Sequence, residues 1–289
     1  MAKPKAKLPL IGRNSHAKEL ASLMRENARR HRLSEVFSDF CELGALSISN
    51  AVDKLQFEGR EARYLQIIAK YEREEIERFP IMLAVLVDWL ECGFADCLGD
   101  LFMSLELGDS FKGQFFTPYP VSSLMARLTV GDVRGQIEKQ GFITINEPTC
   151  GAGGMVIACA EAIHEQGINY QQVIHVTAQD IDATAVHMTY LQLALLHVPA
   201  IVVHGNSLTM KEWAHWVTPA HVFGGWDWRL RSRSAERDAA AVFEVPELAE
   251  AVRKAPDPAP LPSTQAAEPM SEVRCAIVDQ RLEQISLFD

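Results

Sequence analysis

Residues 142–163 decide the fold, and they read Phe-Ile-Thr-Ile-Asn-Glu-Pro-Thr-Cys-Gly-Ala-Gly-Gly-Met-Val-Ile-Ala-Cys-Ala-Glu-Ala-Ile. The apolar residues Phe142, Ile143 and Ile145 predict a short buried strand. A turn is expected over residues 146–154, followed by an apolar helix from about residue 155 to 164. The stretch therefore predicts a strand, a glycine-rich loop and a helix in that order, as in an α/β fold.

The glycines of this loop indicate a binding site. Gly151, Gly153 and Gly154 allow positive φ and carry no side chain, so a ligand can lie against the backbone at a helix N-terminus with unpaired N–H groups. The spacing is neither the dinucleotide pattern G-x-G-x-x-G nor a phosphate-binding loop with its Lys-Ser/Thr. The alternative is a glycine turn that binds nothing.

The loop nevertheless has a specific likeness. Pro148-Thr-Cys-Gly-Ala-Gly-Gly154 resembles the S-adenosylmethionine loop of adenine-N6 DNA methyltransferases, specifically the modification subunits of type I restriction systems. The resemblance implies that Pro148, Cys150, Gly151 and Gly153 bind S-adenosylmethionine. We expect Cys150 to pack within the loop, since no base neighbours it in sequence to activate a thiolate nucleophile.

A second motif precedes the loop by thirty residues. Gly113-Gln-Phe-Phe-Thr-Pro118 resembles the Gly-x-Phe-Tyr/Phe-Thr-Pro motif of the same family. The resemblance implies that Phe115, Phe116, Thr117 and Pro118 contact the methionine end of the cofactor. The alternative is a helix-capping turn with a hydrophobic plug.

Two later strand ends carry candidate cofactor ligands. Residues 173–182 predict a strand that ends in acid, and Asp180 matches the position where such folds hydrogen-bond a ribose. Asp182 is expected to cap the following helix, residues 183–198. A third strand is expected at residues 200–204. After it, Asn206 stands where the family usually has the Asp that accepts from the cofactor's adenine amine.

The resemblance breaks at the motif that holds the target base. The family ends its fourth strand with Asn/Asp-Pro-Pro-Phe/Tyr, and this chain contains no Pro-Pro-aromatic sequence. At the expected distance stand Thr218, Pro219 and His221, which we expect to face the base. Thr is a poorer acceptor than Asn, and His stacks less well than Phe or Tyr. Either the base is bound in a changed way or the chemistry has been lost.

Charge and composition narrow the classes of function. The net charge is −10, which argues against a uniformly basic DNA-binding surface. Residues 1–32 hold nine Lys or Arg and two Glu, a net of +7 against −17 for the remainder. This arm could contact phosphates or serve only as a solubilising tail. The six cysteines are scattered without metal-ligand spacing. No membrane span or signal peptide is apparent, so we expect a cytoplasmic protein.

The chain before the second motif is predicted to be helical. Apolar residues recur at intervals of three and four, as in Leu65, Ile68 and Tyr71, which is typical of packed amphipathic helices. Type I modification subunits also begin with a helical domain. The expected helices cover residues 19–26, 33–40, 44–57, 61–79 and 81–103, the last in one or two pieces.

The end of the chain has a different composition. Six of the fourteen prolines lie between Pro246 and Pro269, which predicts an extended linker. Beyond it, Gln284-Ile-Ser-Leu-Phe288 is similar to the peptide by which bacterial replication and repair proteins dock to the DNA polymerase sliding clamp. That likeness implies that Gln284, Leu287 and Phe288 bind the clamp. The alternative is a terminal helix folded onto the core.

The predicted architecture is α/β: an N-terminal helical domain followed by a Rossmann-like, S-adenosylmethionine-dependent methyltransferase domain. The sheet is expected to be short or completed by a partner. Three strands are clear, a thin fourth is expected at residues 213–217, and the later candidates are residues 241–245 and 273–278. The expected parts are a helical region with a basic arm (1–107), a methyltransferase-like domain (108–230), a linker (231–280) and a docking peptide (281–289).

Two functions follow from these expectations. The first is an S-adenosylmethionine-binding DNA adenine-N6 methyltransferase, whose partners would be DNA and either a specificity subunit or a second copy of the chain. The second is a non-catalytic, methyltransferase-derived factor that associates with DNA and binds the sliding clamp. Methylation of a protein or a small molecule is less favoured, because the flanking motifs match the DNA family.

Overall fold

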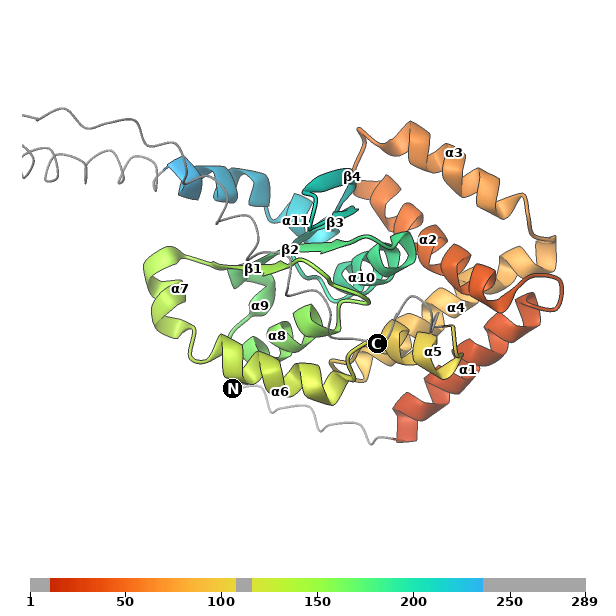
Figure 1. The fold of residues 1–289 in the computed structure, drawn as a ribbon, viewed down its shortest axis with the longest axis horizontal. Coiled ribbons are helices and arrows are strands. Elements are labelled where there is room, and N and C mark those ends of the chain that lie inside the picture. The colour runs from red at the N-terminus through yellow and green to blue at the C-terminus, as the bar shows by residue number, and fades with distance from the viewer. Residues whose placement is uncertain (1–10, 108–115, 236–289) are drawn as a thin grey trace, which may run out of the picture. The chain divides into compact units, whose positions relative to one another are not determined.

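The computed structural model of the protein describes residues 11–107 and 116–235, with helices first and the sheet after them (Figure 1). Helices α1–α5 gather on one side of the strands, as the sequence pattern predicts. They are α1 (Ile11–Asn27), α2 (Leu33–Val52), α3 (Phe57–Ile68), α4 (Arg73–Glu91) and α5 (Cys97–Ser104).

The helix boundaries differ from the expected ones at three places. The expected helix 61–79 is interrupted after Ile68, and α4 starts at Arg73, because the backbone N–H of Glu72 is bound by the Glu75 carboxylate at 2.8 Å in a capping box. Pro80 does not end a helix but lies inside α4. It is exposed, so the carbonyl that loses its helical partner there can be hydrated. The expected helices 33–40 and 44–57 are one helix, α2, up to Val52.

The second half of the described chain alternates strands and helices. Helices α6 (Tyr119–Val130) and α7 (Arg134–Gln140) lead into the sheet. The remaining elements are β1 (Ile143–Glu147), α8 (Gly154–Glu165), α9 (Tyr170–Val173), β2 (Ile174–Asp180), α10 (Ala183–Leu195), β3 (Ala200–Asn206), β4 (Lys211–Val217) and α11 (Pro219–Phe223). Residues 226–235 are also helical.

Among the described residues the strands form one mixed sheet in the order β1-β2-β3-β4. Strands β1, β2 and β3 are parallel and are joined through α8 and α10, which is a Rossmann-like arrangement. Strand β4 is antiparallel to β3. The expected α/β class with a helical N-terminal region is therefore confirmed, and the thin fourth strand is present as a seven-residue strand.

The two faces of β2 bury different residues. Val176 and Ala178 belong to the main apolar core, together with residues of α8 and α10. His175, one position along and so on the other face, packs against Trp226 with ring centroids 5.3 Å apart. Trp226 is 1% exposed and also contacts Phe142 edge-on. The C-terminal end of the described chain thus covers the second face of the sheet.

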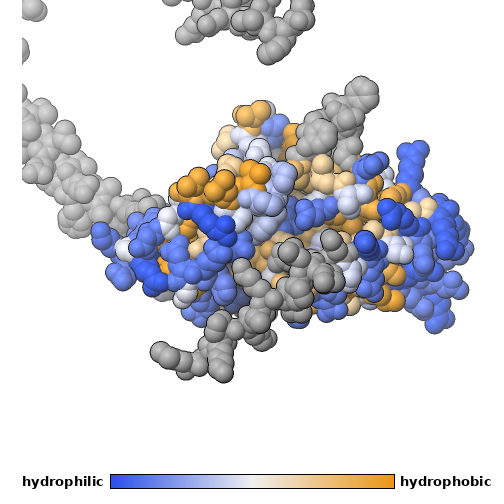
Figure 2. All heavy atoms as spheres, turned by 90° about the horizontal axis from the view of Figure 1, so that it is seen from below, coloured by the Kyte–Doolittle hydropathy of each residue, from blue (hydrophilic) through white to orange (hydrophobic). Residues whose placement is uncertain are grey.

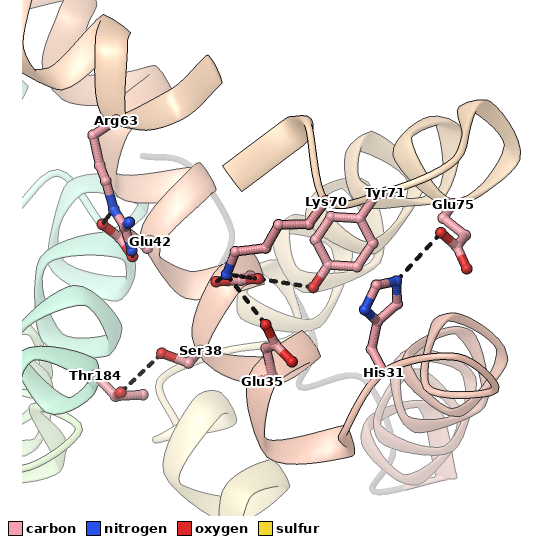
Figure 3. A network of polar contacts seen from close by, with 10 residues as sticks. His31, Glu35, Ser38, Glu42, Arg63, Lys70, Tyr71, Glu75 and Thr184 are labelled. Atoms are coloured by element: carbon pink, nitrogen blue, oxygen red, sulfur yellow. Dashed lines mark hydrogen bonds and ion pairs between the residues drawn. The ribbon is translucent and has the colours of Figure 1, made fainter. Parts of the chain in front are cut away.

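Helix α2 joins the helical region to α10 of the α/β region (Figure 3). Its Asp39 carboxylate accepts hydrogen bonds from the Tyr71 hydroxyl at 2.9 Å and from Lys70 at 3.0 Å. On its other side, Ser38 is hydrogen-bonded to Thr184 at the start of α10, with 3.0 Å between the oxygens. The apolar core likewise includes residues of α2, α10 and the strands in one cluster.

The apolar core of the described residues continues across the expected boundary near residue 107, and the described residues up to Ala235 belong to one compact unit. Residues 231–235, the start of the expected linker 231–280, are helical. The rest of that linker, the two later strand candidates and the docking peptide 281–289 lie outside the described residues. None of the described helices combines the length and the apolar character needed to cross a membrane.

Apolar side chains also gather on the surface. Figure 2 shows orange clusters among the polar residues of the face seen from below in Figure 1, the side on which α6 lies. The outer side of α6 carries Val121, Leu124, Met125 and Leu128, which are 46–78% exposed. Their spacing of three and four residues makes one apolar stripe along the helix.

Arg60 is the polar contact that fixes α3 against the edge of the sheet. Its Nη1 binds Asp53 at 2.7 Å, its Nη2 donates to the carbonyl of His215 at 2.7 Å, and its guanidinium lies 4.3 Å from the Trp216 ring. The Arg60 and Asp53 side chains are only 10% and 15% exposed. We expect Arg60→Met to lower the free energy of unfolding by roughly 2–4 kcal/mol, because it leaves a carboxylate and a carbonyl without their partner.

Arg73→Met is the matched control for this prediction. Arg73 is 92% exposed and, within the described part of the chain, pairs only with Glu77 on the same helix, so its loss should change the unfolding free energy by less than about 0.5 kcal/mol. Urea unfolding of both variants measures the difference. Equal losses for the two variants would show that Arg60 does not hold α3 in place.

Candidate functional site

A cavity of about 400 Å³ opens beside the glycine loop, where strands β1 and β2 end. This is the edge at which open α/β sheets bind their ligands, and the volume falls in the range of small-molecule sites. The cavity is lined by residues from the helical region, from the segment before α6 and from the strand ends: Asp96, Phe116, Thr117, Ser122, Glu147, Thr149, Cys150, Gly151, Ala152, Gly154, Met155 and Asp180.

The loop backbone is hydrogen-bonded to the neighbouring strand. The N–H of Cys150 donates to the Gln179 carbonyl at 2.8 Å, and the N–H of Gly151 donates to the Asp180 carboxylate at 2.9 Å. The other Asp180 oxygen accepts from the N–H of Asp182 at 2.9 Å. Asp180 thus lines the cavity and also holds the loop. Asp182 caps α10 by accepting from the N–H of Thr184 and Ala185, as predicted.

Helix α10 holds the carbonyls of the same loop. Thr189 Oγ1 donates to the Gly151 carbonyl at 2.8 Å, and Gln192 Nε2 donates to the Ala152 carbonyl at 2.8 Å. Gln192 Nε2 also donates to Asp96 Oδ1 at 2.9 Å. The loop is therefore positioned from both β2 and α10 before any ligand binds.

The second sequence motif reaches the same cavity. Phe116 and Thr117 line it, and the Phe116 ring packs on Phe102 of α5 with centroids 5.0 Å apart. Gly151 has φ of 54°, and a Cβ there would stand 2.9 Å from the Phe116 ring. Pro118 is the N-cap of α6, and Phe115 lies outside the described residues. The two motifs, thirty residues apart in sequence, are thus side by side.

The lining of the cavity is acidic. Asp96, Glu147 and Asp180 all contribute to it, and no Lys, Arg or His is present among the described lining residues. Burial raises the pKa of Asp96 to about 6 and also raises the pKa of Asp180. A ligand that brings positive charge would relieve this cost, whereas a polyphosphate would increase it.

Cys150 and Gly153 support the loop from within. Cys150 is buried, and burial raises the pKa of its thiol to about 12, so the thiol stays neutral and unreactive at neutral pH. Gly153 has φ of 93° and approaches Thr189 so closely that a Cβ would be 3.2 Å from its Oγ1. Gly153 does not line the cavity, whereas Gly154 does.

Pro148 and Asn206 are not among the residues that line the cavity. Both form hydrogen bonds with the turn that follows β3. The Pro148 carbonyl accepts from Ser207 Oγ at 2.5 Å. Asn206 Oδ1 accepts from the N–H of Leu208 and Thr209, at 3.0 and 3.1 Å, and so shapes the turn into β4. The Asn206 oxygen that was expected to meet adenine is already engaged by backbone.

Thr218, Pro219 and His221 lie at the opposite end of the sheet. Strand β4 runs back along β3, with Lys211 beside Asn206 and Val217 beside Ile201. Thr218 consequently follows at the amino end of β3, where its Oγ1 donates to the Val198 carbonyl at 2.8 Å. Seven residues of strand span roughly 20 Å. Thr218 is fully buried and caps α11, so its expected position facing a base is not supported by this geometry.

His221 is also buried, and its ring forms hydrogen bonds within the protein. It is 1% exposed, its Nδ1 is 2.9 Å from His175 Nε2, and its Nε2 is 3.1 Å from Asp227 Oδ1. Since the carboxylate can only accept, His221 Nε2 donates to Asp227, and His221 Nδ1 accepts from His175 Nε2–H. Both rings are neutral in this arrangement. Burial lowers the pKa of His175 to about 4 and lowers that of His221.

The chain matches the family model described as N-6 DNA Methylase over residues 102–233. The described residues of this region are similar to that family. The match includes both motifs and the whole sheet. It ends close to the boundary expected at residue 230, although it begins within α5.

A known protein is also similar to part of this chain. The type I restriction enzyme MpnII methylase subunit of Mycoplasma pneumoniae is 24% identical over 135 residues, which are 44% of this chain and 23% of that protein. The chain therefore spans less than a quarter of this relative's length.

Solved structures resemble the chain only loosely. One, a candidate class I S-adenosylmethionine-dependent methyltransferase from Listeria monocytogenes, has a TM-score of 0.37 and 16% identity over 68% of this chain and 55% of that chain. The type I restriction-modification methyltransferase subunit of Streptococcus thermophilus has a TM-score of 0.35 and 14% identity over 71% and 60%. TM-scores this low leave the fold to be described from the chain's own elements.

Three site residues were not expected from the sequence. Asp96, the N-cap of α5, and Gln192 of α10 belong to no recognisable motif, and their meeting depends on how α5 packs against α10. Glu147 could have been predicted from the sequence, because it ends β1 directly before the glycine loop, at the edge where ligands bind. It lines the cavity and accepts from the N–H of Thr149 at 3.2 Å.

The buried histidine pair predicts a pH dependence of stability. Because the folded-state pKa of His175 is about 4 against an ordinary 6.5, the unfolded state binds more protons between these values, and stability is lost as pH falls through that window. We expect the stability advantage of the wild type over His175→Gln to shrink by about 2 kcal/mol from pH 7 to pH 5.

Comparing the two proteins isolates this effect from other groups. Asp96, with its raised pKa, works in the opposite direction over part of the same range, and it is present in both. Urea unfolding at the two pH values gives the required difference. A difference between wild type and variant that stays constant with pH would contradict a neutral, buried His175.

Proposed function

We propose that this chain binds S-adenosylmethionine in the cavity beside the glycine loop, as a protein of the DNA adenine-N6 methyltransferase class. The observation that carries the proposal is the lining: three carboxylates around a glycine-rich helix N-terminus, with no cationic side chain among the described residues there. Such a site disfavours the phosphates of ATP or a dinucleotide and suits a nucleoside with a sulfonium and an ammonium group.

The residues present fit this cofactor. The Gly151 backbone lies at a place that a Cβ would fill, so a ligand can approach it closely beside Phe116. Asp180 still has free lone pairs with which to accept from ribose hydroxyls. Phe116 and Thr117 would contact the methionine end. When bound, the cofactor supplies an electrophilic methyl group on sulfur; this chain's own residues bind it, orient it and keep it apart from bulk water.

DNA as the methyl acceptor is proposed from the likeness to N-6 DNA methylases, including a type I methylase subunit. The same likeness suggests a specificity subunit or a second copy of the chain as a partner. Because Thr218 and His221 are buried at the far end of the sheet, the contacts to a target base are assigned to other groups.

The burial of Thr218 and His221 also favours a second candidate function. A chain that keeps the cofactor cavity but lacks the base-binding motif would bind the cofactor as a structural or sensing ligand without transferring its methyl group. Purified full-length protein incubated with methyl-labelled cofactor and unmethylated DNA separates the two. Label in DNA supports the first function, and tight cofactor binding with no label in DNA supports the second.

The cofactor proposal itself is tested by calorimetry of the full-length chain. S-adenosylmethionine should bind with a Kd in the micromolar range, whereas ATP and NAD should show no saturable binding under the same conditions. Preference for ATP or NAD would overturn the proposal, because it would mean that the three carboxylates do not govern selection.

Gly151→Ala tests the close approach of ligand and loop. An alanine Cβ would stand 2.9 Å from the Phe116 ring, so the ring, which lines the cavity together with Gly151, must shift and the shape of the cavity must change. We expect a loss of affinity for S-adenosylmethionine of roughly tenfold or more.

Gly141→Ala is the matched control. Gly141 also has positive φ, at 75°, but a Cβ there would meet nothing within 4 Å. Both variants should lose about 1 kcal/mol of stability from backbone strain. Gly141→Ala should keep its affinity within about twofold of the wild type, given that no contact is changed. Unchanged affinity in Gly151→Ala as well would count against the cavity as the cofactor site.

A further inference from the structure

Asp96 brings a buried carboxylate from the helical region to the cofactor cavity. It is 3% exposed, precedes α5 as its N-cap and lines the cavity. Its Oδ1 accepts from the N–H of Gly99 and from Gln192 Nε2, both at 2.9 Å. Among the described residues, no hydrogen bond reaches Oδ2 and no cation pairs with the carboxylate. Oδ1 thus forms hydrogen bonds within the protein, whereas Oδ2 has no hydrogen-bond partner among the described residues.

The position of the free oxygen relative to the loop is well defined. A Cβ on Gly154, the first residue of α8, would lie 2.9 Å from Asp96 Oδ2. Asp180, in contrast, binds the N–H of Gly151. The two carboxylates therefore contact opposite ends of the glycine loop. If Asp180 takes the ribose, Asp96 faces the part of the ligand that lies towards the start of α8.

An unpaired carboxylate in such a place is costly to the free protein. Burial raises its pKa to about 6, against an ordinary 3.8, so ionisation at neutral pH opposes folding. Asparagine would make the same two hydrogen bonds through its carbonyl oxygen and is an equally good N-cap. Neither the cap of α5 nor the hydrogen bond to Gln192 therefore requires the negative charge of Asp96. We infer that this charge serves to bind a ligand.

We propose that Asp96 binds the α-ammonium group of the methionine end of S-adenosylmethionine through Oδ2. This inference rests on the proposed function, because it names a contact within the same site. An ammonium group carries a positive charge and three N–H donors, so it can hydrogen-bond the free oxygen. A sulfonium carries charge but no donor. Both oxygens of Asp180 already accept backbone hydrogen bonds, and Asp96 is more buried than Glu147.

The test compares three ligands on full-length wild type and Asp96→Asn. S-adenosylmethionine has both the sulfonium and the ammonium, S-adenosylhomocysteine has only the ammonium, and 5′-methylthioadenosine has neither. We expect Asp96→Asn to bind the first two roughly tenfold or more weakly and to bind 5′-methylthioadenosine within about twofold of the wild type.

A second readout does not involve ligand. Without ligand at pH 7, Asp96→Asn should unfold at a higher temperature than the wild type, because it removes the buried charge and keeps both hydrogen bonds. Asp88→Asn makes the same change at an exposed position of α4 and should alter neither affinity nor unfolding temperature appreciably.

Five outcomes would overturn the assignment. Equal weakening of all three ligands, or a lower unfolding temperature, would show that Asp96 acts only by shaping the site. Weakening of S-adenosylmethionine alone would place Asp96 at the sulfonium. No change for any ligand would remove it from the site while leaving the proposed function intact. A wild type that binds none of the three ligands would overturn the proposed function together with this inference.

Discussion

The site depends on the fixed backbone of residues 150–152. Four hydrogen bonds, two to β2 and two from α10, hold these three residues through the N–H groups of Cys150 and Gly151 and the carbonyls of Gly151 and Ala152. Gly151 then needs a left-handed φ that a side chain would oppose. A loop bound in this way does not have to be ordered when a ligand arrives, so little conformational entropy is lost on binding.

The helical region is part of the site. Asp96 comes from the turn before α5 and meets Gln192 of α10, which in turn holds the Ala152 carbonyl. Helix α5 also carries Phe102, against which Phe116 packs. The main apolar core runs through α2, α5, α10 and the strands without interruption. Removing the first hundred residues would therefore expose the loop and delete one of the three acidic groups at the cavity.

Periodicity and local motifs predicted the helical region, the glycine loop, the first three strands and the cap at Asp182, because each of these is encoded by neighbouring residues. The meeting of Phe116 with Gly151 was predicted only through the family resemblance. Asp96 and Gln192 could not be found in this way, since 96 residues separate them and only the packing of α5 on α10 brings them together. The break expected between residues 79 and 81 is absent, because Pro80 lies on an exposed face of α4 and tertiary packing decides which face of a helix is exposed.

The position of Thr218, in contrast, could have been predicted from the length of the connection between β3 and β4 alone. Only four residues, Ser207 to Met210, separate β3 from β4. A parallel crossover needs about a dozen residues or more, whereas a hairpin needs only a few. The strand after Asn206 must then run antiparallel, and whatever follows it is carried to the amino ends of the parallel strands, away from the glycine loop. In the described residues, the cavity beside the glycine loop is therefore built largely on β1, β2, α5 and α10, while the segment that was expected to hold the base closes the far end of the sheet.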